Sequence, residues 1–368
     1  MKTKVLIVIP RLGGTGGTET VLLSWQKYFS NHSDVKLTVL APQGLRVTAY
    51  DRPIAKIVEP VSKIPVPAQR LLMIPRILWA LHKNQYDDVI CTTSKLIKMI
   101  AVLKKLCMPK HRQFRLVSWI HSSLYDEPSI TISDLQYADA HLAISSGIIS
   151  QMQQNKITGK KYLIFNPVSE SKTDDVSSMS VVNDHIKIVK FVYIGRVMWE
   201  GQKNLAELFS ALDKVSGNWQ LEIFGTGDAA EIDHVKNFVS NHQLEKHVII
   251  RGWVAKPFDN LECDYLVLTS KYEGLPMVLI EAQQHGIACI SANCPTGPDD
   301  IITSESGYLY EPGDIDQLSG ILQRCIDAPT VPFDPRKIRA LSSRFAEGNY
   351  FENVERSLNM INTSNRKG

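Results

Sequence analysis

Two glutamates separated by seven residues are the most informative chemical groups in this sequence. Glu273 precedes a predicted helix and Glu281 lies inside it, because Pro276 suits a helix start and Gly286 suits its end. The free backbone N–H groups of Gly274–Met277 would then form an anion site. This arrangement predicts a bound phosphate with a carboxylate on either side to hold hydroxyl groups. The alternative is that Glu273 complements the helix dipole and Glu281 is solvated.

Two cations follow another predicted strand. Arg196 comes just after the strand 188–194, and Lys203 lies seven residues further on, just inside the next predicted helix. Arginine binds phosphate oxygens bidentately and lysine binds them as a point charge, so the pair suits a diphosphate. The alternative is two solvated surface cations.

Other strand ends carry glycines or aromatic groups. Gly225-Thr226-Gly227 follows the strand 220–224, and Trp253-Val254 follows the strand 247–252. A lone Gly-x-Gly is weak evidence for a phosphate site. The Trp253 ring is better suited to packing between domains.

In the first half, the loop Gly13–Glu19 joins the first strand to a helix, and His121 follows the strand 116–120. The loop does not match a dinucleotide-binding motif, because no acidic strand-end residue follows at the required distance. A lone histidine is more often structural than catalytic, so His121 needs further support.

These groups need a scaffold, and the hydrophobic pattern predicts parallel sheets. Short aliphatic runs alternate with amphipathic stretches of helical length, which is typical of βαβ units. The predicted strands cover residues 5–9, 35–40, 89–91, 116–120 and 140–144, and then 188–194, 220–224, 247–252, 265–269 and 288–292.

The pattern therefore predicts an α/β protein with two doubly wound, Rossmann-like domains facing a central cleft. The N-terminal domain covers 1–168, a polar linker covers 169–186, and the C-terminal domain covers 187–334. The helices of 335–368 are then free to cross back to the first domain. In such folds ligands bind at the carboxyl ends of the strands.

Composition excludes several protein classes. Of the 368 residues 44% are hydrophobic and 21% charged, which permits buried cores and argues against a disordered chain. No apolar run approaches the ~20 residues that span a bilayer, and the run 5–9 is too short for a signal peptide. The six cysteines have neither disulfide-scaffold nor zinc-site spacing, which suits a cytoplasmic protein.

Charge is distributed unevenly along the chain. Residues 1–165 carry a net charge of +12 and residues 166–368 carry −9. The segment 95–115 holds seven Lys or Arg, no acidic residue, and aliphatic residues at helical spacing. It is either a sheet-covering helix with a solvated lysine face, or a surface for anionic lipid head groups or glycolipid phosphates. The net charge of +12 in this half favours the second interpretation. Nucleic acid is not expected, because no basic motif with interleaved aromatic residues is present.

The string EGLPMVLIEA over residues 273–282 resembles the family 4 retaining glycosyltransferases, which have the GT-B fold. The strings HLAISSGIISQM, IFNPV, EGQKNL, GNWQL and LYEPGDI are similar to segments of the bacterial enzymes in that family that add galactose to the lipopolysaccharide outer core. The likeness runs from about residue 110 to residue 315. It is poor over 41–110, a region that would help to shape the acceptor site.

The resemblance implies roles for the groups described above. It implies that Glu273 and His121 contact the donor sugar, and that Arg196 and Lys203 neutralise the leaving pyrophosphate. The donor-binding residues that it implies are Gly16, Gly17, Glu19, Gly225, Gly227, Trp253, Val254, Gly274, Leu275, Pro276, Met277 and Glu281, the last of these on the ribose.

The resemblance also implies a reaction. The expected enzyme moves galactose or glucose from a UDP-sugar to a lipid-linked glycan such as the lipopolysaccharide core, at the inner face of the plasma membrane, with retention of configuration. Its cations and backbone dipoles are expected to replace a divalent metal, so we expect neither a metal nor another cofactor. The alternatives are a UDP-sugar epimerase, or a capsule or exopolysaccharide glycosyltransferase with a different acceptor.

Overall fold

This computed structural model describes residues 3–11, 17–31, 34–43, 72–109, 113–168, 188–259, 261–328 and 330–363. The chain divides into two compact units, each of which is described by itself. Unit 1 comprises residues 1–167 and 350–368, and unit 2 comprises residues 168–349. The predicted linker 169–186 lies outside the described residues.

Unit 1 is an α/β unit. Its elements are β1 (Thr3–Val8), α1 (Gly17–Asn31), β2 (Val35–Leu40), α3 (Met73–Lys83), β3 (Asp88–Cys91), α4 (Ser94–Cys107), β4 (Arg115–Ile120), the 3-10 helix η1 (Ile132–Tyr137), β5 (Ala140–Ala143), α5 (Ser146–Gln154) and β6 (Lys160–Leu163), with the later part of α12 (Glu347–Thr363).

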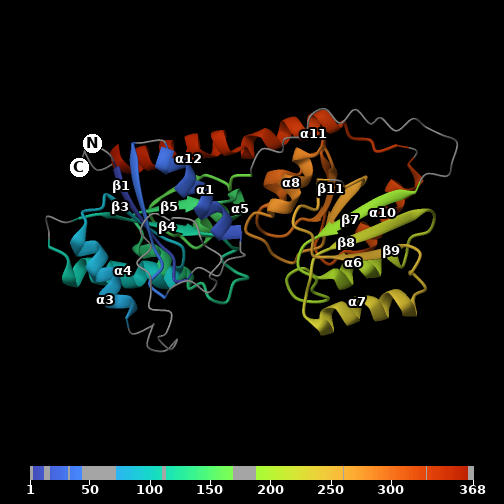
Figure 1. Ribbon diagram of the computed structural model, residues 1–368, viewed down its shortest axis with the longest axis horizontal. Helices are drawn as coiled ribbons and strands as arrows, with labels where there is room; N and C mark the ends of the chain where they lie inside the picture. Colours follow the sequence, from blue (N-terminus) through green and yellow to red (C-terminus); the bar gives the residue numbers. More distant parts are fainter. Residues whose placement is uncertain are drawn as a thin grey trace. The chain divides into compact units, whose positions relative to one another are not determined.

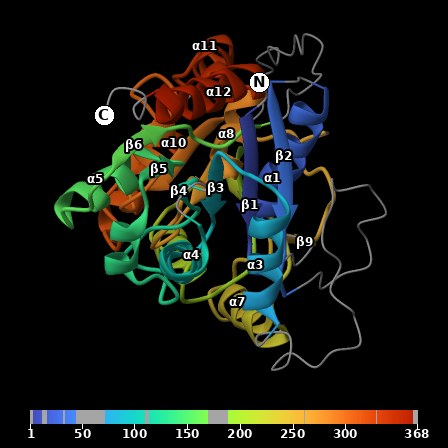
Figure 2. The ribbon, with the colours of Figure 1, turned by 90° about the vertical axis from the view of Figure 1, so that its left-hand side faces the viewer.

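The sheet of unit 1 is wholly parallel in the order β2-β1-β3-β4-β5-β6. The chain reverses its direction across the sheet between β1 and β3. In Figure 1, α1 and α12 lie on one side of this sheet and α3 and α4 on the other. The right-handed crossover rule places α1 opposite α3 and α4, because the chain crosses the sheet in one direction through α1 and in the other through α3 and α4. Figure 2 shows the same separation of α12 from α3 and α4. Both faces are covered, so the strands are buried almost throughout, and Val5–Val8 are fully enclosed.

The C-terminal helix is held in unit 1 by aromatic packing against α1. The Trp25 indole N–H donates to the Tyr350 hydroxyl at 2.6 Å. The Tyr28 and Phe351 rings stack with centroids 4.0 Å apart. At the far end of the sheet Arg115 Nε lies 2.7 Å from Asp88, and Arg115 Nη1 donates to the Ile361 carbonyl. Residues 335–349 belong to unit 2.

Unit 2 repeats the α/β plan. Its elements are β7 (Val189–Ile194), α6 (Leu205–Leu212), β8 (Trp219–Phe224), α7 (Ala229–Asn241), β9 (Val248–Gly252), β10 (Tyr265–Leu268), α8 (Met277–Gln284), β11 (Ala288–Ala292), α9 (Pro298–Ile301), β12 (Gly307–Tyr310), α10 (Ile315–Asp327), α11 (Pro335–Ser342), the 3-10 helix η2 (Ser343–Phe345) and the start of α12.

The sheet of unit 2 is parallel in the order β12-β11-β10-β7-β8-β9, which is the Rossmann arrangement with its reversal between β7 and β10. In Figure 1, α6 and α7 lie on one side of this sheet and α8 and α11 on the other. The predicted α/β fold with two doubly wound sheets is confirmed.

The ten predicted strands are all present, each within two residues at either end. The structure adds β6 and β12, which the sequence did not predict. Both lie at the edge of a described sheet, where one flank is unpaired and the hydrophobic run is short. The helix expected to start at Pro276 begins one residue later, with Pro276 in the capping position.

The basic segment 95–115 divides into two elements. Most of it forms α4, but Arg115 starts β4. Three of its cations pair with acidic residues of other elements: Lys98 with Asp134, Lys104 with Asp139, and Arg115 with Asp88. None of the helices in the described part of the chain has the length and apolarity needed to cross a membrane.

Candidate active site

The best supported site residues of unit 2 follow the two strands at which the sheet reverses. Arg196 lies two residues beyond β7, and Glu273 lies in the loop after β10. At such a reversal the two loops diverge to opposite faces and leave a crevice at the carboxyl edge of the sheet, where ligands bind. The topology therefore brings these two predicted groups to one place.

Lys203 and Glu273 form the central contact of this site. Lys203 Nζ lies 2.6 Å from Glu273 Oε1, and the exposed fractions of the two side chains are only 19% and 10%. The alternative of Lys203 as a solvated surface cation is therefore wrong. The two charges satisfy each other, which lowers the cost of burying both.

The loop that carries Lys203 is fastened to the loop that carries Glu273. The Thr269 hydroxyl is 3.1 Å from the carbonyl oxygens of both Lys203 and Asn204. The Gln202 amide donates to the Tyr272 carbonyl at 3.1 Å, and the Lys271 N–H donates to the Gln202 carbonyl at 2.8 Å. The prediction that Lys203 lies just inside the helix is wrong, because α6 begins at Leu205 and Lys203 belongs to the loop before it. The position of Lys203 is set by the backbone contacts of this loop as well as by its ion pair.

The chain after β11 supports Glu273 from its other side. The Thr296 hydroxyl donates to the Glu273 carbonyl. Gly297 follows with a φ of +100°, and a Cβ atom there would lie 2.6 Å from Pro276 Cδ and 2.9 Å from Leu275 Cα. Only glycine allows this approach, so Gly297 fixes the path of the chain that leads into α8.

Glu281 lies on α8, five residues into the helix. Burial raises the pKa of this carboxyl, so the alternative of a solvated Glu281 is wrong. Its side chain has no hydrogen-bond or ion-pair partner among the described residues. A partly buried carboxylate of this kind is suited to accept hydrogen bonds from ligand hydroxyl groups.

Arg196 presents its exposed side chain beside the same strand end. Its carbonyl accepts a hydrogen bond from the Tyr193 hydroxyl at 2.7 Å. Burial raises the pKa of Tyr193, and the negative charge of Glu273 raises it further, whereas Arg196 lowers it. Tyr193 therefore lies within the electrostatic reach of both predicted site residues.

Gly225 and Gly227 have a structural reason to be glycine. A Cβ atom at Gly225 would lie 1.8 Å from the Gly195 carbonyl oxygen, and one at Gly227 would lie 2.1 Å from that of Val197. The two glycines let the chain after β8 run against the chain after β7, beside Arg196. Their effect on a ligand would be indirect, through the path of that backbone.

Trp253 and Val254 follow β9 and are exposed, Trp253 at 72% and Val254 at 41%. The predicted packing of Trp253 between the domains stays a prediction, because the two units are described separately. An indole this exposed at the carboxyl edge of a sheet is free to stack on a ligand ring.

The site residues predicted in unit 1 gather at the reversal of its own sheet. A cavity of about 470 Å³ opens at the ends of β1, β3 and β4 and contains both Glu19 and His121. Its other lining residues are Ile9, Pro10, Arg11, Thr18, Thr92, Thr93, Ile120, Ser122, Glu127, Ser129 and Ile130. Gly17 is the first residue of α1, two positions before Glu19, and Gly16 lies outside the described residues.

His121 is neutral in this cavity. Burial lowers its pKa to about 3, and the ring packs on Trp119 with centroids 4.3 Å apart. Its buried Nε2 atom has no hydrogen-bond partner among the residues that the structure describes. A neutral imidazole with one unused nitrogen suits hydrogen bonding to a sugar hydroxyl rather than charge neutralisation.

The sequence did not single out Thr269, Thr296, Gly297 or Arg11. The two threonines and Gly297 follow strands β10 and β11, so a search of every strand end at the carboxyl edge would have found them. Arg11 follows β1 in the same way. Nothing in their types alone separates them from ordinary loop residues.

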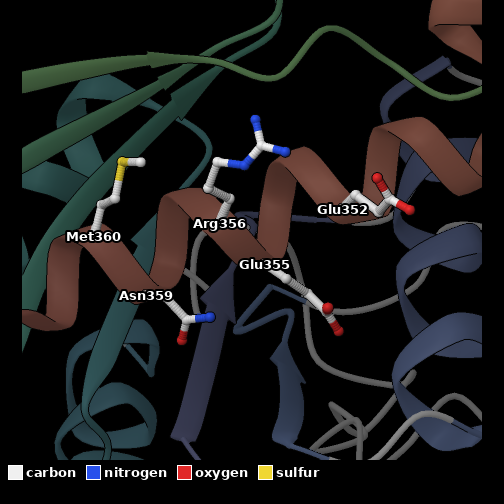
Figure 3. A pocket seen from close by; sticks show the side chains of 5 residues that line it. All are labelled: Glu352, Glu355, Arg356, Asn359 and Met360. Carbon is white, nitrogen blue, oxygen red and sulfur yellow. The ribbon is translucent and has the colours of Figure 1, made fainter.

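A shallow hollow of about 520 Å³ also lies on the outward face of α12. In Figure 3, Arg356 and Met360 point to one side of the helix, whereas Glu355 and Asn359 point to the other. The side chains diverge, so this is an open helix face and not a site with converging groups. Among the described residues, no group of three His, Cys, Asp or Glu side chains is placed to hold a metal ion.

Comparison with known proteins adds an independent line of evidence. Residues 189–328 match the family described as glycosyl transferases group 1. The chain is 34% identical over 287 residues to the lipopolysaccharide 1,6-galactosyltransferase of Salmonella typhimurium, a match that covers 76% of each protein.

Two solved structures have a similar fold. One is the apo form of the lipopolysaccharide outer core galactosyltransferase WaaB, with a TM-score of 0.83 and 30% identity over 97% of this chain and 99% of that one. The other is HepE of Anabaena in complex with UDP, with a TM-score of 0.72 and 18% identity over 97% and 100%. The second likeness concerns the fold alone.

Proposed function

We propose that this chain, which belongs to the group 1 glycosyl transferases, transfers a hexose to the lipopolysaccharide core as its relatives do. It has the GT-B fold. We further propose that the donor is UDP-galactose or UDP-glucose. HepE, which shares the fold, binds UDP, and this supports a uridine nucleotide as carrier.

The observation that carries this proposal is the grouping of Arg196, Lys203 and Glu273 at the reversal of the unit 2 sheet. When the anomeric C–O bond breaks, negative charge develops on the diphosphate and positive charge on the sugar ring. The two cations and the N–H groups at the start of α8 stabilise the diphosphate. Glu273 holds the sugar through its hydroxyl groups, and Glu281 accepts hydrogen bonds from the ribose.

Retention of configuration follows from attack on the face that the diphosphate leaves. The acceptor oxygen forms the new bond to the anomeric carbon while the bond to the phosphate oxygen breaks. That phosphate oxygen then takes the proton of the acceptor hydroxyl. Neutral His121 holds the transferred sugar by a hydrogen bond, because its lowered pKa leaves it without charge at neutral pH.

We propose that transfer needs no divalent metal, because Arg196 and Lys203 already supply positive charge for the leaving group. The chain contains the string Asp314-Ile315-Asp316, which has the Asp-x-Asp spacing of some metal-dependent transferases. However, Asp314 caps α10 by accepting from the Gln317 N–H, and Asp316 lies 2.5 Å from Lys214 Nζ. Transfer rates should therefore be unchanged by EDTA, and activity that EDTA abolishes and Mg²⁺ or Mn²⁺ restores would refute this proposal.

We also propose that unit 1 rests on the anionic inner face of the membrane through α4. Leu106 is 75% exposed and Val102 is 46% exposed, beside the exposed Lys95 and Lys105, which have no acidic partner among the described residues. Such a face suits shallow contact with anionic lipid. The protein should then sediment with vesicles containing phosphatidylglycerol but not with neutral vesicles, and Leu106→Asp should weaken this binding.

The central test is UDP release by the purified protein with UDP-galactose, UDP-glucose and UDP-N-acetylglucosamine, with and without truncated lipopolysaccharide. We expect release with one of the two hexoses only when the acceptor is present, together with a larger glycan product. Conversion of the UDP-sugar to its epimer without acceptor would indicate an epimerase. Absence of any acceptor-dependent release would refute the proposed function.

A further inference from the structure

A second cavity of unit 1 lies between α3 and strand β2, which is an edge strand of the described sheet. Its volume is about 330 Å³, within the range of small-ligand sites. Its lining residues are Leu6, Lys36, Thr38, Val39, Leu40, Trp79, Ala80, Lys83, Asn84 and Tyr86. None of them lines the cavity that holds His121.

The two walls of this cavity, α3 and β2, are joined by contacts at the start of α3. Arg76 Nη1 donates to the Pro42 carbonyl at 2.7 Å, and Gln43 Nε2 lies 3.5 Å from Met73 Sδ. These contacts fix the first turn of α3 to the chain just after β2. The last turn of α3 then lies beside the start of β2, and the cavity is the slot between them. We call it the β2 slot.

Among the described residues, the charged side chains that line the β2 slot are those of Lys36 and Lys83. Within that part of the chain neither lysine pairs with a carboxylate, and no acidic residue lines the slot. Lys83 Nζ lies 4.4 Å from the centroid of the Trp79 ring. Such a cation–π contact holds the ammonium group in place without neutralising its charge. The slot is therefore complementary to an anion.

The β2 slot also contains an aromatic face and a row of polar groups. Trp79 is 52% exposed, although its neighbours Ala80 and Leu81 on α3 are buried. Asn84 Nδ2 lies 3.2 Å from the Tyr86 hydroxyl, which is also hydrogen-bonded to Thr38. An indole face packs against the C–H face of a sugar ring, and amide and hydroxyl groups bind sugar hydroxyls.

We propose that the β2 slot binds an anionic saccharide, meaning a sugar ring that carries a phosphate or carboxylate group. Trp79 packs on the ring, the row of Asn84, Tyr86 and Thr38 binds its hydroxyl groups, and the two lysines bind the charged group. The ligand is either a charged unit of the acceptor glycan remote from the reacting hydroxyl or a free sugar phosphate. The site takes no part in the transfer reaction, so it goes beyond the proposed function.

The test uses the full chain labelled with 5-fluorotryptophan and observed by ¹⁹F NMR. The Trp79 resonance is assigned by its loss in Trp79→Phe. Titration with glucose 6-phosphate should shift this resonance saturably, whereas glucose and inorganic phosphate, each offering half of the chemistry, should bind more weakly. Lys83→Met should weaken glucose 6-phosphate binding about fivefold, as expected for one solvent-accessible charge contact.

The matched control is Lys27→Met, which removes an exposed lysine of α1 away from the slot and should leave binding unchanged. If Trp79 does not respond to glucose 6-phosphate, or if Lys83→Met binds as tightly as the parent protein, the proposal fails. The readout is binding, so either result leaves the transfer assay untouched. Conversely, a protein inactive in transfer can still show the Trp79 shift.

Competition distinguishes the two sources of ligand. If the slot binds a charged unit of the acceptor, truncated lipopolysaccharide oligosaccharide with its phosphates should displace glucose 6-phosphate. The enzymatically dephosphorylated oligosaccharide should not. If neither oligosaccharide competes, the slot serves a free sugar phosphate. Displacement by both forms alike would show that charge is not recognised and would overturn the proposal.

Discussion

At the scale of single residues, the proposed function assigns Lys203 and Glu273, which form an ion pair, to different parts of one ligand. A diphosphate that enters the site offers Lys203 a second anion, and a sugar offers Glu273 hydroxyl donors. Each group exchanges one partner for another without being left unpaired. The arrangement therefore avoids the cost of an isolated buried charge in both the empty and the occupied state.

Replacing Lys203 with Ala should lower UDP release by about a hundredfold, because loss of one preorganised charge at a developing anion has an effect of that size. The measurement is initial-rate UDP release by protein whose folding is checked by thermal denaturation. The control is Lys271→Ala, which removes an exposed side chain from the neighbouring loop and should retain activity. Near-normal release by folded Lys203→Ala protein would remove Lys203 from the mechanism.

Thr269 should act through Lys203 as a positioning residue. Thr269→Val keeps the shape of the side chain but leaves the carbonyls of Lys203 and Asn204 without their hydroxyl donor. We expect a fall in kcat and a loss of about 1–3 kcal/mol in the free energy of unfolding. Thr269→Ser keeps the hydroxyl and should restore kcat. If Val and Ser behave alike, the hydroxyl does not position Lys203.

At the scale of elements, the loop after β11 determines where α8 begins. Gly297→Ala places a methyl group against Pro276 and Leu275 at a φ of +100°. The loop must move and take Glu273 with it, so we expect at least a tenfold loss of transfer, since small displacements of positioned groups have large effects. UDP release and the melting temperature are the two measurements.

Gly313→Ala separates this effect from backbone strain. Gly313 also has a positive φ, +88°, but no atom lies within 4 Å of a Cβ placed there. Both substitutions should lower stability by about 1 kcal/mol through strain alone. Only Gly297→Ala should lose transfer. Equal activity in the two variants would show that the loop does not set the position of Glu273.

The strands were predictable from sequence because buried parallel strands are short, nearly continuous aliphatic runs. The runs 5–9 and 265–269 are of this kind and are recovered as β1 and β10. The edge strand β6, with its Lys160 and Lys161, lacks such a run, since one flank needs no burial. The predicted start of α8 is wrong by one residue, because Pro276 packs against Gly297 of a loop that follows another strand.

Site residues could be predicted from the sequence only where several chemically active side chains lie within one short segment. Glu273 and Glu281 share a helix start, so their spacing alone indicates a site. The contributions of Thr269, Thr296 and Gly297 depend on contacts between loops that follow different strands. The order of the strands in the sheet decides which loops lie side by side, and the hydrophobic periodicity of the sequence does not reveal that order.

At the scale of the whole molecule, the charge asymmetry of the sequence overstates the free positive charge of unit 1. Lys98, Lys104 and Arg115 are paired with acids from η1, the chain before β5, and β3. The cations without such partners among the described residues include Lys36, Lys83, Lys95 and Lys105. They lie in two separate regions, the β2 slot and the exposed face of α4, which we propose as anion-binding surfaces.

A buried histidine of unit 1, His141, should make the stability of the protein depend on pH. His141 Nε2 lies 2.7 Å from the Thr158 carbonyl, so it carries the proton, and Nδ1 accepts from the Ser118 hydroxyl at 2.6 Å. Burial lowers the pKa of His141 to about 4, below its ordinary value of 6.5. Between pH 4 and pH 6.5, His141 is therefore protonated in the unfolded chain but neutral in the folded protein. Stability from this residue is fully present above about pH 6.5 and falls by up to about 1.4 kcal/mol per pH unit as the pH drops to 4.

Urea denaturation at a series of pH values, followed by tryptophan fluorescence, measures this loss. His141→Gln keeps an N–H for Thr158 but cannot take up the proton. It should be less stable than the parent at pH 7, because the Ser118 bond is lost, yet show a flatter decline between pH 6.5 and 4. His121, whose pKa is lowered to about 3, adds a loss of the same sign in both proteins, so it cancels from the comparison. Parallel stability curves for the two proteins would mean that His141 is protonated as readily in the folded state as in the unfolded chain, and that its burial does not oppose the charge.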